Sequence, residues 1–262
     1  MASAPGLPGL PMLYRDLMPL SSQEHRTWKL RPLATLEMLK GVHALPITVD
    51  EFPIAQRFFP IVFSSGADSV PLALMGLNEG VNVYVDEAGG WREGVYLPAF
   101  MRRYPFLLAR LTQDAEELSL CFDPTAGVIG DFEDGIALFN DAGEPEQPIK
   151  DMLGFCEQFE HAAQRTNAFM KDLEETGLME EGELSIGLQE EGSQPYVYRG
   201  FRMINEQKLR DLRGDQLRKM QQNGMLTLIY AHLFSLGLTS EIFARQAEQG
   251  KLPPQQPAVA NS

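Results

Sequence analysis

The chain has 262 residues, 44% of them hydrophobic, and a formal net charge of −14. This composition is sufficient for a sizeable core, in one large domain or two small ones. No apolar run approaches the roughly 18 residues that a membrane helix requires, so we expect no transmembrane segment. The first residues also lack the basic region and unbroken apolar stretch of a secretory signal, so we expect a cytoplasmic protein.

The charge is unevenly distributed along the chain. Residues 114–192 contain 21 acids and 3 bases, a balance of −18, whereas the remainder contains 15 acids and 19 bases, a balance of +4. Nucleic acid is therefore not expected as the main partner, because neutralising phosphates requires clustered Lys and Arg. The acidic segment would suit a partner with a basic surface or the chain's own basic flanks. The alternative is plain solvation of an acidic helix and its loops.

The predicted elements begin after residues 1–18, which are rich in Pro, Gly and small residues and are expected to be disordered. At residues 48–53, Thr48 or Asp50 can cap a helix whose first turn carries acids. Residues 58–63 are aromatic and β-branched, which predicts a strand.

Several short apolar runs are followed by Asp or Asn and then Gly, which is typical of strands joined by tight turns. The predicted strands are residues 70–77, 81–85, 118–122 and 136–139. The first two are separated by Asn78-Glu79-Gly80, which predicts a hairpin. This pattern indicates a largely antiparallel sheet rather than parallel strands joined by crossover helices.

The second half of the chain is expected to be more helical. From Pro148 to Gly177, apolar residues recur at three- and four-residue steps, which predicts a long helix. Residues 184–188 and 196–204 alternate and predict a second hairpin. Helices are then predicted at residues 206–223, at the nearly all-apolar and therefore buried 225–236, and from Thr239, before a disordered Pro/Gln tail at 251–262.

These elements predict an α+β fold in which a mainly antiparallel sheet packs against the long helix and a helical C-terminal part covers it. The folded region, residues 19–250, is expected to form one domain. The strands near Ile186 and Val197 either join the same sheet or form a separate small one.

Residues 91–108 hold five aromatic residues, three arginines and two prolines. The planar fork of arginine binds carboxylates in a bidentate manner and stacks on aromatic rings. The stretch therefore predicts a site for a small anionic or aromatic ligand, formed by Trp91, Tyr96, Arg102, Arg103 and Tyr104. The alternative is a structural cluster in which one arginine pairs with an acid and the aromatic rings belong to the core.

The same stretch carries a family resemblance. The string Pro-Ala-Phe-Met-Arg-Arg-Tyr-Pro-Phe at residues 98–106 is its most specific part. Further matching runs are Phe-Pro-Ile-Val-Phe at 59–63, Pro-Leu-Ala-Leu-Met-Gly-Leu at 71–77, Val-Tyr-Val-Asp at 83–86, Ala-Leu-Phe at 137–139, Phe-Cys-Glu-Gln-Phe at 155–159 and the apolar run at 226–237. With these residues the chain resembles the SapC-like bacterial protein family over roughly residues 45–237.

The resemblance implies a family that is named for its association with bacterial surface layers. Its members often lie beside outer-membrane transporters and flavin-dependent halogenases. It implies no catalytic residue that can be carried over to this chain. A peptide-transporter permease has the same name, but the lack of an expected transmembrane helix separates the chain from it.

Chemistry-bearing residues give few further signals. No pair of the four histidines has metal-binding spacing, so no metal site is predicted, although His43 could cluster with Asp50 and Glu51. His232 lies in an apolar run and is expected to be a satisfied core histidine. Cys121 and Cys156 lack Cys-x-x-Cys spacing and are expected to be buried and reduced, which fits a cytoplasmic location.

Three functions remain open at this point, and the cofactor is unknown. The first is a cytoplasmic accessory protein of a surface, nutrient or peptide-handling system, which binds the predicted ligand or a basic partner. The second is an enzyme, either a metal-dependent oxygenase-like one or one that modifies peptides. The third is a structural component of a surface layer, against which the absence of a signal peptide argues.

Overall fold

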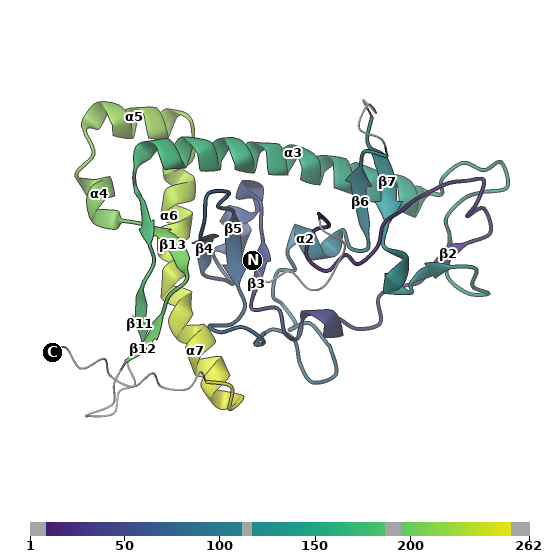
Figure 1. Ribbon diagram of the computed structural model, residues 1–262, viewed down its shortest axis with the longest axis horizontal. Coiled ribbons are helices and arrows are strands. Elements are labelled where there is room, and N and C mark those ends of the chain that lie inside the picture. The colour runs from purple at the N-terminus through teal and green to yellow at the C-terminus, as the bar shows by residue number, and fades with distance from the viewer. Residues whose placement is uncertain (1–8, 112–116, 187–194, 253–262) are drawn as a thin grey trace. The chain divides into compact units, whose positions relative to one another are not determined.

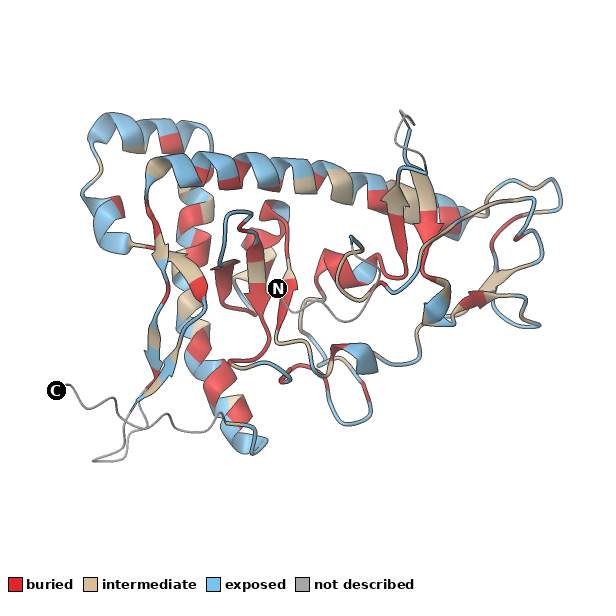
Figure 2. Cartoon of the chain, in the orientation of Figure 1, coloured by how far each residue is buried: buried red, intermediate tan, exposed pale blue. Residues whose placement is uncertain are grey.

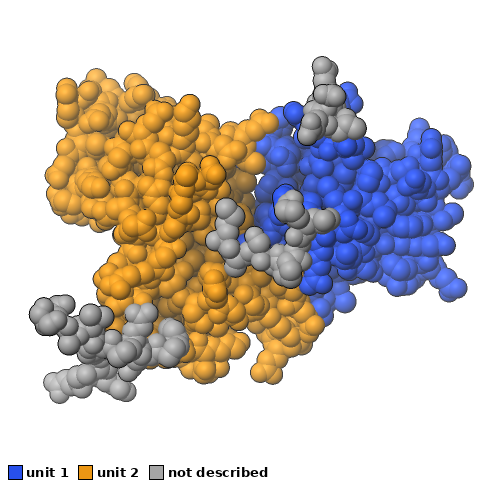
Figure 3. Space-filling model, viewed as in Figure 1, with its two compact units in different colours: residues 1–35, 99–162 blue, residues 36–98, 163–262 orange. Residues whose placement is uncertain are grey.

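The computed structural model describes residues 9–111, 117–186 and 195–252 of the chain (Figure 1). It divides into two compact units, coloured separately in Figure 3. Unit 1 comprises Met1–Thr35 and Ala99–Ala162, and unit 2 comprises Leu36–Pro98 and Ala163–Ser262. That residues 19–250 form one domain stays a prediction. All strand pairs recorded in the described residues are antiparallel, and with the long helix they confirm the predicted α+β class.

In its described residues, unit 1 contains two small sheets and one short α-helix besides its part of the long helix. The first sheet has the order β1-β7-β6 and the second β8-β2-β9. The elements are β1 (Met18–Pro19), β2 (Lys29–Leu30), α2 (Ala99–Arg102), β6 (Phe106–Ala109), β7 (Ser119–Phe122), β8 (Ile129–Gly130), β9 (Ile136–Ala137) and residues 147–162 of α3 (Gln147–Thr176). Burial of apolar side chains stabilises the unit around a core of Phe106, Phe122, Ile129, Leu138, Phe139, Ile149 and Cys156.

The N-terminal segment takes part in unit 1 from residue 9 onwards. Tyr14, which lies within the segment predicted to be disordered, is buried, and its hydroxyl donates to the Phe106 carbonyl at 2.7 Å. The Arg15 amide donates to Asp123 at 2.7 Å. These long-range bonds, together with the pairing of β1 with β7, hold the segment to the sheet. Residues 1–8, the rest of the predicted disordered segment, lie outside the described residues.

Unit 2 is built on a five-stranded antiparallel sheet of order β10-β13-β4-β5-β3. Its strands are β3 (Ala44–Pro46), β4 (Ile61–Ser64), β5 (Pro71–Leu74), β10 (Met179–Glu181) and β13 (Phe201–Ile204). Figure 2 shows that β4 and β5 are largely buried. This burial agrees with the near-continuous apolar sequence of both strands, because only a strand covered on both faces lacks polar alternation.

The capped helix predicted at residues 48–53 forms. Thr48 and Glu51 make a capping box around a single 3-10 turn, with the Thr48 amide 2.8 Å from Glu51 Oε2. α1 (Phe52–Ala55) continues from it, and Pro53 occupies its first turn, where proline is tolerated. Phe52 of α1 packs edge-to-face on Phe169 of α3 at 6.1 Å between ring centroids.

The predicted hairpin between residues 70–77 and 81–85 is wrong. β5 pairs instead with β3 and β4, and residues 81–85 cross close to its end without forming a strand. The Val83 amide donates to the Met75 carbonyl at 2.9 Å. A Cβ on Gly76 would lie 2.0 Å from the Val81 carbonyl oxygen, so only glycine permits this close crossing.

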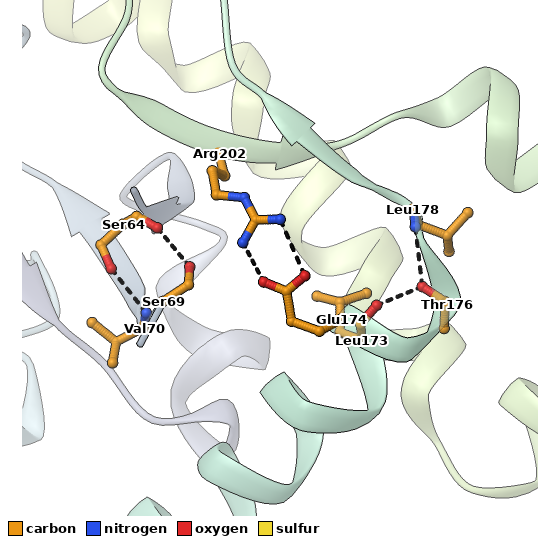
Figure 4. A network of polar contacts seen from close by, with 8 residues as sticks. All are labelled: Ser64, Ser69, Val70, Leu173, Glu174, Thr176, Leu178 and Arg202. Atoms are coloured by element: carbon orange, nitrogen blue, oxygen red, sulfur yellow. Dashed lines mark hydrogen bonds and ion pairs between the residues drawn. The ribbon is translucent and has the colours of Figure 1, made fainter. Parts of the chain in front are cut away.

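The C-terminal end of α3 is tied to the sheet of unit 2. Arg202 on β13 forms a bidentate ion pair with Glu174, as Figure 4 shows, and one of its two bonds measures 3.1 Å. The hydrogen bond from Arg202 lowers the pKa of Glu174. Just beyond, Thr176 donates to the Leu173 carbonyl and accepts from the Leu178 amide, which turns the chain from the helix into β10.

The predicted second hairpin forms, and residues 187–188 of its first predicted strand lie outside the described residues. β11 (Leu184–Ile186) pairs with β12 (Tyr196–Tyr198), as a separate two-stranded sheet. Gly200, with φ of 90°, breaks the run predicted at 196–204 and sends β13 into the five-stranded sheet. The helices are α4 (Glu206–Arg210), α5 (Gly214–Gln222), α6 (Met225–Ser235) and α7 (Thr239–Glu248). Residues 253–262 of the predicted tail lie outside the described residues.

Candidate functional site

Two of the predicted ligand-binding residues, Trp91 and Tyr96, belong to unit 2. The Trp91 indole N–H donates to the Val95 carbonyl at 3.0 Å, and its ring stacks on Tyr84 at 5.9 Å between centroids. The Tyr96 hydroxyl donates to Glu51 Oε1 at 3.0 Å. Both side chains are half-buried and contribute to packing within their unit.

The other three, Arg102, Arg103 and Tyr104, belong to unit 1. Arg102 is exposed and lies 4.9 Å from the centroid of the Phe155 ring. Tyr104 is buried and packs edge-to-face on Tyr14 at 5.2 Å. The five predicted residues therefore fall into two groups, and their role in binding a ligand stays a prediction.

Arg103 is a buried cation among aromatic rings. Its guanidinium lies 3.9 Å from the Phe159 centroid and 5.1 Å from that of Phe100, and Nη1 is 3.3 Å from Glu160 Oε1. Among the described residues its Nε has no hydrogen-bond partner. This geometry is that of an arginine that stacks on aromatic rings and pairs with an acid inside its own unit.

The thiol of Cys156 lies near this cation. Burial raises its pKa to about 11, although Arg103 acts in the opposite direction. The thiol is therefore protonated at neutral pH and is a poor nucleophile. Cys121 is also free and buried, as the sequence predicts for both cysteines.

A metal-binding cluster at His43, Asp50 and Glu51 was one possibility raised by the sequence. Glu51 instead accepts hydrogen bonds from Thr48 and Tyr96, and Asp50 forms an ion pair with Arg165. In the part of the chain that the structure describes, no three His, Cys, Asp or Glu residues are placed to hold a metal ion.

The most exposed large apolar side chain of the described residues lies on α6. Phe234 is 73% exposed and stacks on Tyr230, itself 40% exposed, with 5.6 Å between ring centroids. The two rings are four residues apart, so they stand one above the other on the same helix face. We call the surface formed by Thr227, Tyr230 and Phe234 the outer face of α6. The helix contains no Asp, Glu, Lys or Arg.

The two stacked rings lie between two hollows. All residues that line these hollows belong to unit 2. The first has a volume of about 280 Å³ and is lined by Glu180, Met203, Ile204, Asn205, Glu206, Tyr230, Leu233, Phe234 and Leu236. The second has a volume of about 370 Å³ and is lined by Gln56, Thr227, Tyr230, Ala231 and Phe234. The outer face is thus an aromatic ridge between two concave surfaces, a shape that is typical of docking sites.

The opposite face of α6 is held by polar contacts. His232 is fully buried; its Nδ1 is 2.7 Å from the Ile61 carbonyl, and its Nε2 accepts from the Ile204 amide at 3.1 Å. Ser235, also fully buried, accepts from the Ile61 amide at 2.8 Å. These bonds fix His232 as the neutral tautomer with its proton on Nδ1 and join α6 to both β4 and β13. The expected core histidine is confirmed.

Stability should depend on pH through His232. Burial lowers its pKa from 6.5 to about 4, while the bond to Ile61 acts in the opposite direction. Between these values the unfolded chain binds a proton that the folded chain does not. The stabilisation is therefore complete above pH 6.5 and is lost as the pH falls, by about 2 kcal/mol between pH 6.5 and 5. Urea unfolding of the wild type and of His232→Gln at both pH values measures this loss. If the wild type and His232→Gln lost the same free energy of unfolding, the pH dependence would come from groups other than His232.

The sequence did not reveal the outer face. Residues 225–236 predict a buried helix because they are almost uniformly apolar, so no polar stripe marks a solvent side. The prediction is wrong for Tyr230 and Phe234, which are exposed, while the polar His232 and Ser235 are buried. A usable signal was the four-residue spacing of Tyr230 and Phe234, which sets both rings on the face away from His232.

One stretch is apolar and long enough to be compatible with a membrane span. It covers α6 and α7, Met225–Glu248, with a mean hydropathy of 1.3 in its most apolar window, 39% of which is buried. Length and composition alone give this result, and core helices of soluble proteins share both properties. The search covered only the described residues.

Comparisons with known proteins place the chain in a family. No curated protein and no solved structure matches it. The family model of SapC matches residues 20–242, which include parts of both units and the whole aromatic–arginine stretch. Because this match covers most of the chain, the resemblance found in the sequence is confirmed, and the chain belongs to the SapC family.

Proposed function

We propose that the chain is an accessory protein that works by binding another protein within a bacterial surface, nutrient or peptide-handling system. One observation carries the proposal: Phe234 remains 73% exposed and stacked on Tyr230 on a helix without a charged residue. An aromatic surface of this kind reduces solubility, and in folded proteins it is typical of a site that a partner covers.

Two further features support the proposal. The lining of the second hollow favours binding over catalysis, and the two thiols favour a location in the cytoplasm. Among the described residues, the polar side chains of the second hollow's lining are Gln56, Thr227 and Tyr230, so it offers a surface to bury rather than an acid–base pair. The free, buried thiols of Cys121 and Cys156 agree with a reducing compartment. Exposed acids of α3, such as Asp172 and Glu175, would favour a partner with a basic surface.

In-cell cross-linking of the tagged protein tests the proposal. Phe234→Ser should abolish the cross-linked species that the wild type gives, because serine removes the apolar contact without disturbing the buried face of α6. The matched control is Ile136→Ser, which alters a 49% exposed apolar residue of unit 1 and should leave the species unchanged. Unchanged cross-linking by Phe234→Ser would reject the outer face as the contact.

Native mass spectrometry of protein purified without chelators separates the accessory protein from the enzyme. A mass that corresponds to the polypeptide alone would agree with the binding function. A stoichiometric metal or small molecule that is retained by the protein would favour an enzyme and indicate its class.

A further inference from the structure

We propose that the first hollow beside α6 receives an arginine side chain of the partner protein. The inference rests on the proposed use of this face for binding another protein, and it names the chemical group that the partner inserts. Three properties of the hollow lead to it: a positioned carboxylate, a wall of aromatic and apolar side chains, and room for one long side chain.

Glu180 on β10 supplies the positioned carboxylate. The side-chain amide of Asn205 donates to Glu180 Oε2 at 2.6 Å. Asn205 is itself fixed, because its backbone amide donates to the Leu178 carbonyl at 2.9 Å and its side-chain oxygen accepts from the Lys208 amide at 2.8 Å. Within the described part of the chain, Glu180 Oε1 accepts no hydrogen bond. One oxygen of the carboxylate is thus held in place, while the other can accept from a donor of the partner.

The cations that already lie near the hollow leave this carboxylate accessible. Lys208 Nζ is 4.0 Å from Glu180 Oε2, which is beyond hydrogen-bonding distance. Arg210 pairs instead with Glu206, the second acid of the lining, at 2.6 Å on the exposed surface of α4. A cation of the partner can therefore pair with Glu180 without breaking a short ion pair.

The remaining wall suits the other parts of an arginine side chain. Tyr230 and Phe234 are 40% and 73% exposed, and a planar guanidinium stacks on aromatic rings of this kind. Met203, Leu233 and Leu236 line the same hollow and offer apolar surface to the methylene stem. The hollow therefore combines the three kinds of contact that an arginine makes.

Unit 1 contains the same combination of groups around an arginine of this chain. The guanidinium of Arg103 lies 3.9 Å from the centroid of the Phe159 ring, and its Nη1 is 3.3 Å from Glu160 Oε1. An aromatic ring and one partly exposed carboxylate are thus sufficient to hold a guanidinium in this protein.

Size and charge narrow the choice of ligand further. A cavity of about 150 Å³ accommodates a benzene ring, so the hollow of about 280 Å³ has room for one long side chain. Lysine fits less well, because its ammonium is a compact and strongly hydrated charge that does not stack as a plane. The headgroups of an anionic membrane would be repelled by Glu180 and Glu206.

A peptide titration followed by NMR tests the inference on the purified full chain. The protein carries ¹³C-methyl methionine, so Met203 reports on the first hollow and Met152 on unit 1. Acetyl-Ala-Arg-Ala amide at millimolar concentrations should move the Met203 signal and leave the Met152 signal in place. The matched peptide with citrulline has the same shape without the charge and should move neither signal.

Three variants should change the affinity for the arginine peptide in different directions. Glu180→Gln keeps an acceptor for Asn205 and should weaken binding by about fivefold, while Lys208→Gln removes a competing cation and should strengthen it by about twofold. Phe234→Ser removes the stacking surface and should weaken binding by about threefold. All three side chains are at least partly exposed, so the melting temperature should stay that of the wild type. The opposite signs for Glu180 and Lys208 distinguish recognition of charge from a general disturbance of the fold.

In-cell cross-linking separates this inference from the proposed function. Glu180→Gln should reduce the cross-linked species, whereas Asp134→Asn, which removes a charge from a 77% exposed side chain of unit 1, should not. A species that Phe234→Ser abolishes and Glu180→Gln leaves unchanged retains the proposed function and rejects the arginine. A species that Phe234→Ser leaves unchanged rejects the proposed function, whereas the peptide titration tests the hollow independently.

The titration itself has outcomes that overturn the inference. A Met203 signal that stays in place, an equal response to the citrulline peptide, or unchanged binding by Glu180→Gln excludes an arginine site in the first hollow. Binding of the protein to phosphatidylglycerol vesicles through Phe234, without a response to the arginine peptide, assigns the face to a membrane surface and rejects the proposed function as well.

Discussion

Replacing His232 with alanine is expected to lower the free energy of unfolding by about 3–5 kcal/mol. The change leaves the Ile61 carbonyl and the Ile204 amide without their buried partner, and each such loss costs about 1–3 kcal/mol. It also opens a cavity beside Phe63, whose ring centroid lies 5.0 Å from that of His232. Urea unfolding followed by circular dichroism measures the difference.

The control for this experiment lies on the same helix. Phe234→Ala removes a larger side chain from the exposed outer face, where Phe234 is 73% exposed, and should cost less than about 1 kcal/mol. His232→Gln retains hydrogen-bonding groups and should fall between the two. If His232→Ala and Phe234→Ala were equally destabilising, α6 would not be held by its polar contacts to β4 and β13.

Replacing Arg103 gives the second large effect, and the size of that effect should depend on the replacement. Arg103→Ala empties a space enclosed by Phe159 and Phe100 and should cost about 2–4 kcal/mol, mainly through lost packing. Arg103→Met fills the space with an apolar chain and leaves Glu160, which is 34% exposed, able to hydrate. Its stability should therefore lie within about 1 kcal/mol of the wild type, since apolar replacements of buried ion pairs are often neutral.

Chemical denaturation of both Arg103 variants distinguishes packing from charge. If Arg103→Met is as destabilising as Arg103→Ala, the charge itself is required for folding. The Met variant also tests the predicted ligand site, because it keeps the fold while removing the guanidinium. A carboxylate ligand that binds the wild type and not Arg103→Met would support that prediction.

The local elements were largely predictable from the sequence, because period and capping are local properties. The three- and four-residue spacing from Pro148 to Gly177 gave α3 to within one residue at each end. The Thr48–Glu51 capping box also formed. The failures involve contacts between distant residues: strand partners in a sheet depend on tertiary packing, which is why residues 81–85 were assigned to the wrong hairpin.

The candidate site was harder to predict for a related reason. The aromatic–arginine stretch was conspicuous by composition, yet the structure distributes its five predicted residues over two units. The outer face of α6 was missed because apolar residues on an exposed and on a buried face give the same sequence pattern. The hydrogen bonds that join His232 and Ser235 to the sheet determine which face of α6 turns outward.

The polar contacts beneath α6 also affect how much conformational entropy its aromatic rings would lose on binding. Bonds from His232 and Ser235 to backbone groups of two strands prevent the helix from rolling about its own axis. Tyr230 and Phe234 are consequently presented in one orientation before any partner arrives. If this face binds a partner as proposed, association would order little that was mobile, so more of the apolar contact energy would be retained as affinity. In that function His232 would contribute from the buried side of α6, by holding the exposed face in one orientation.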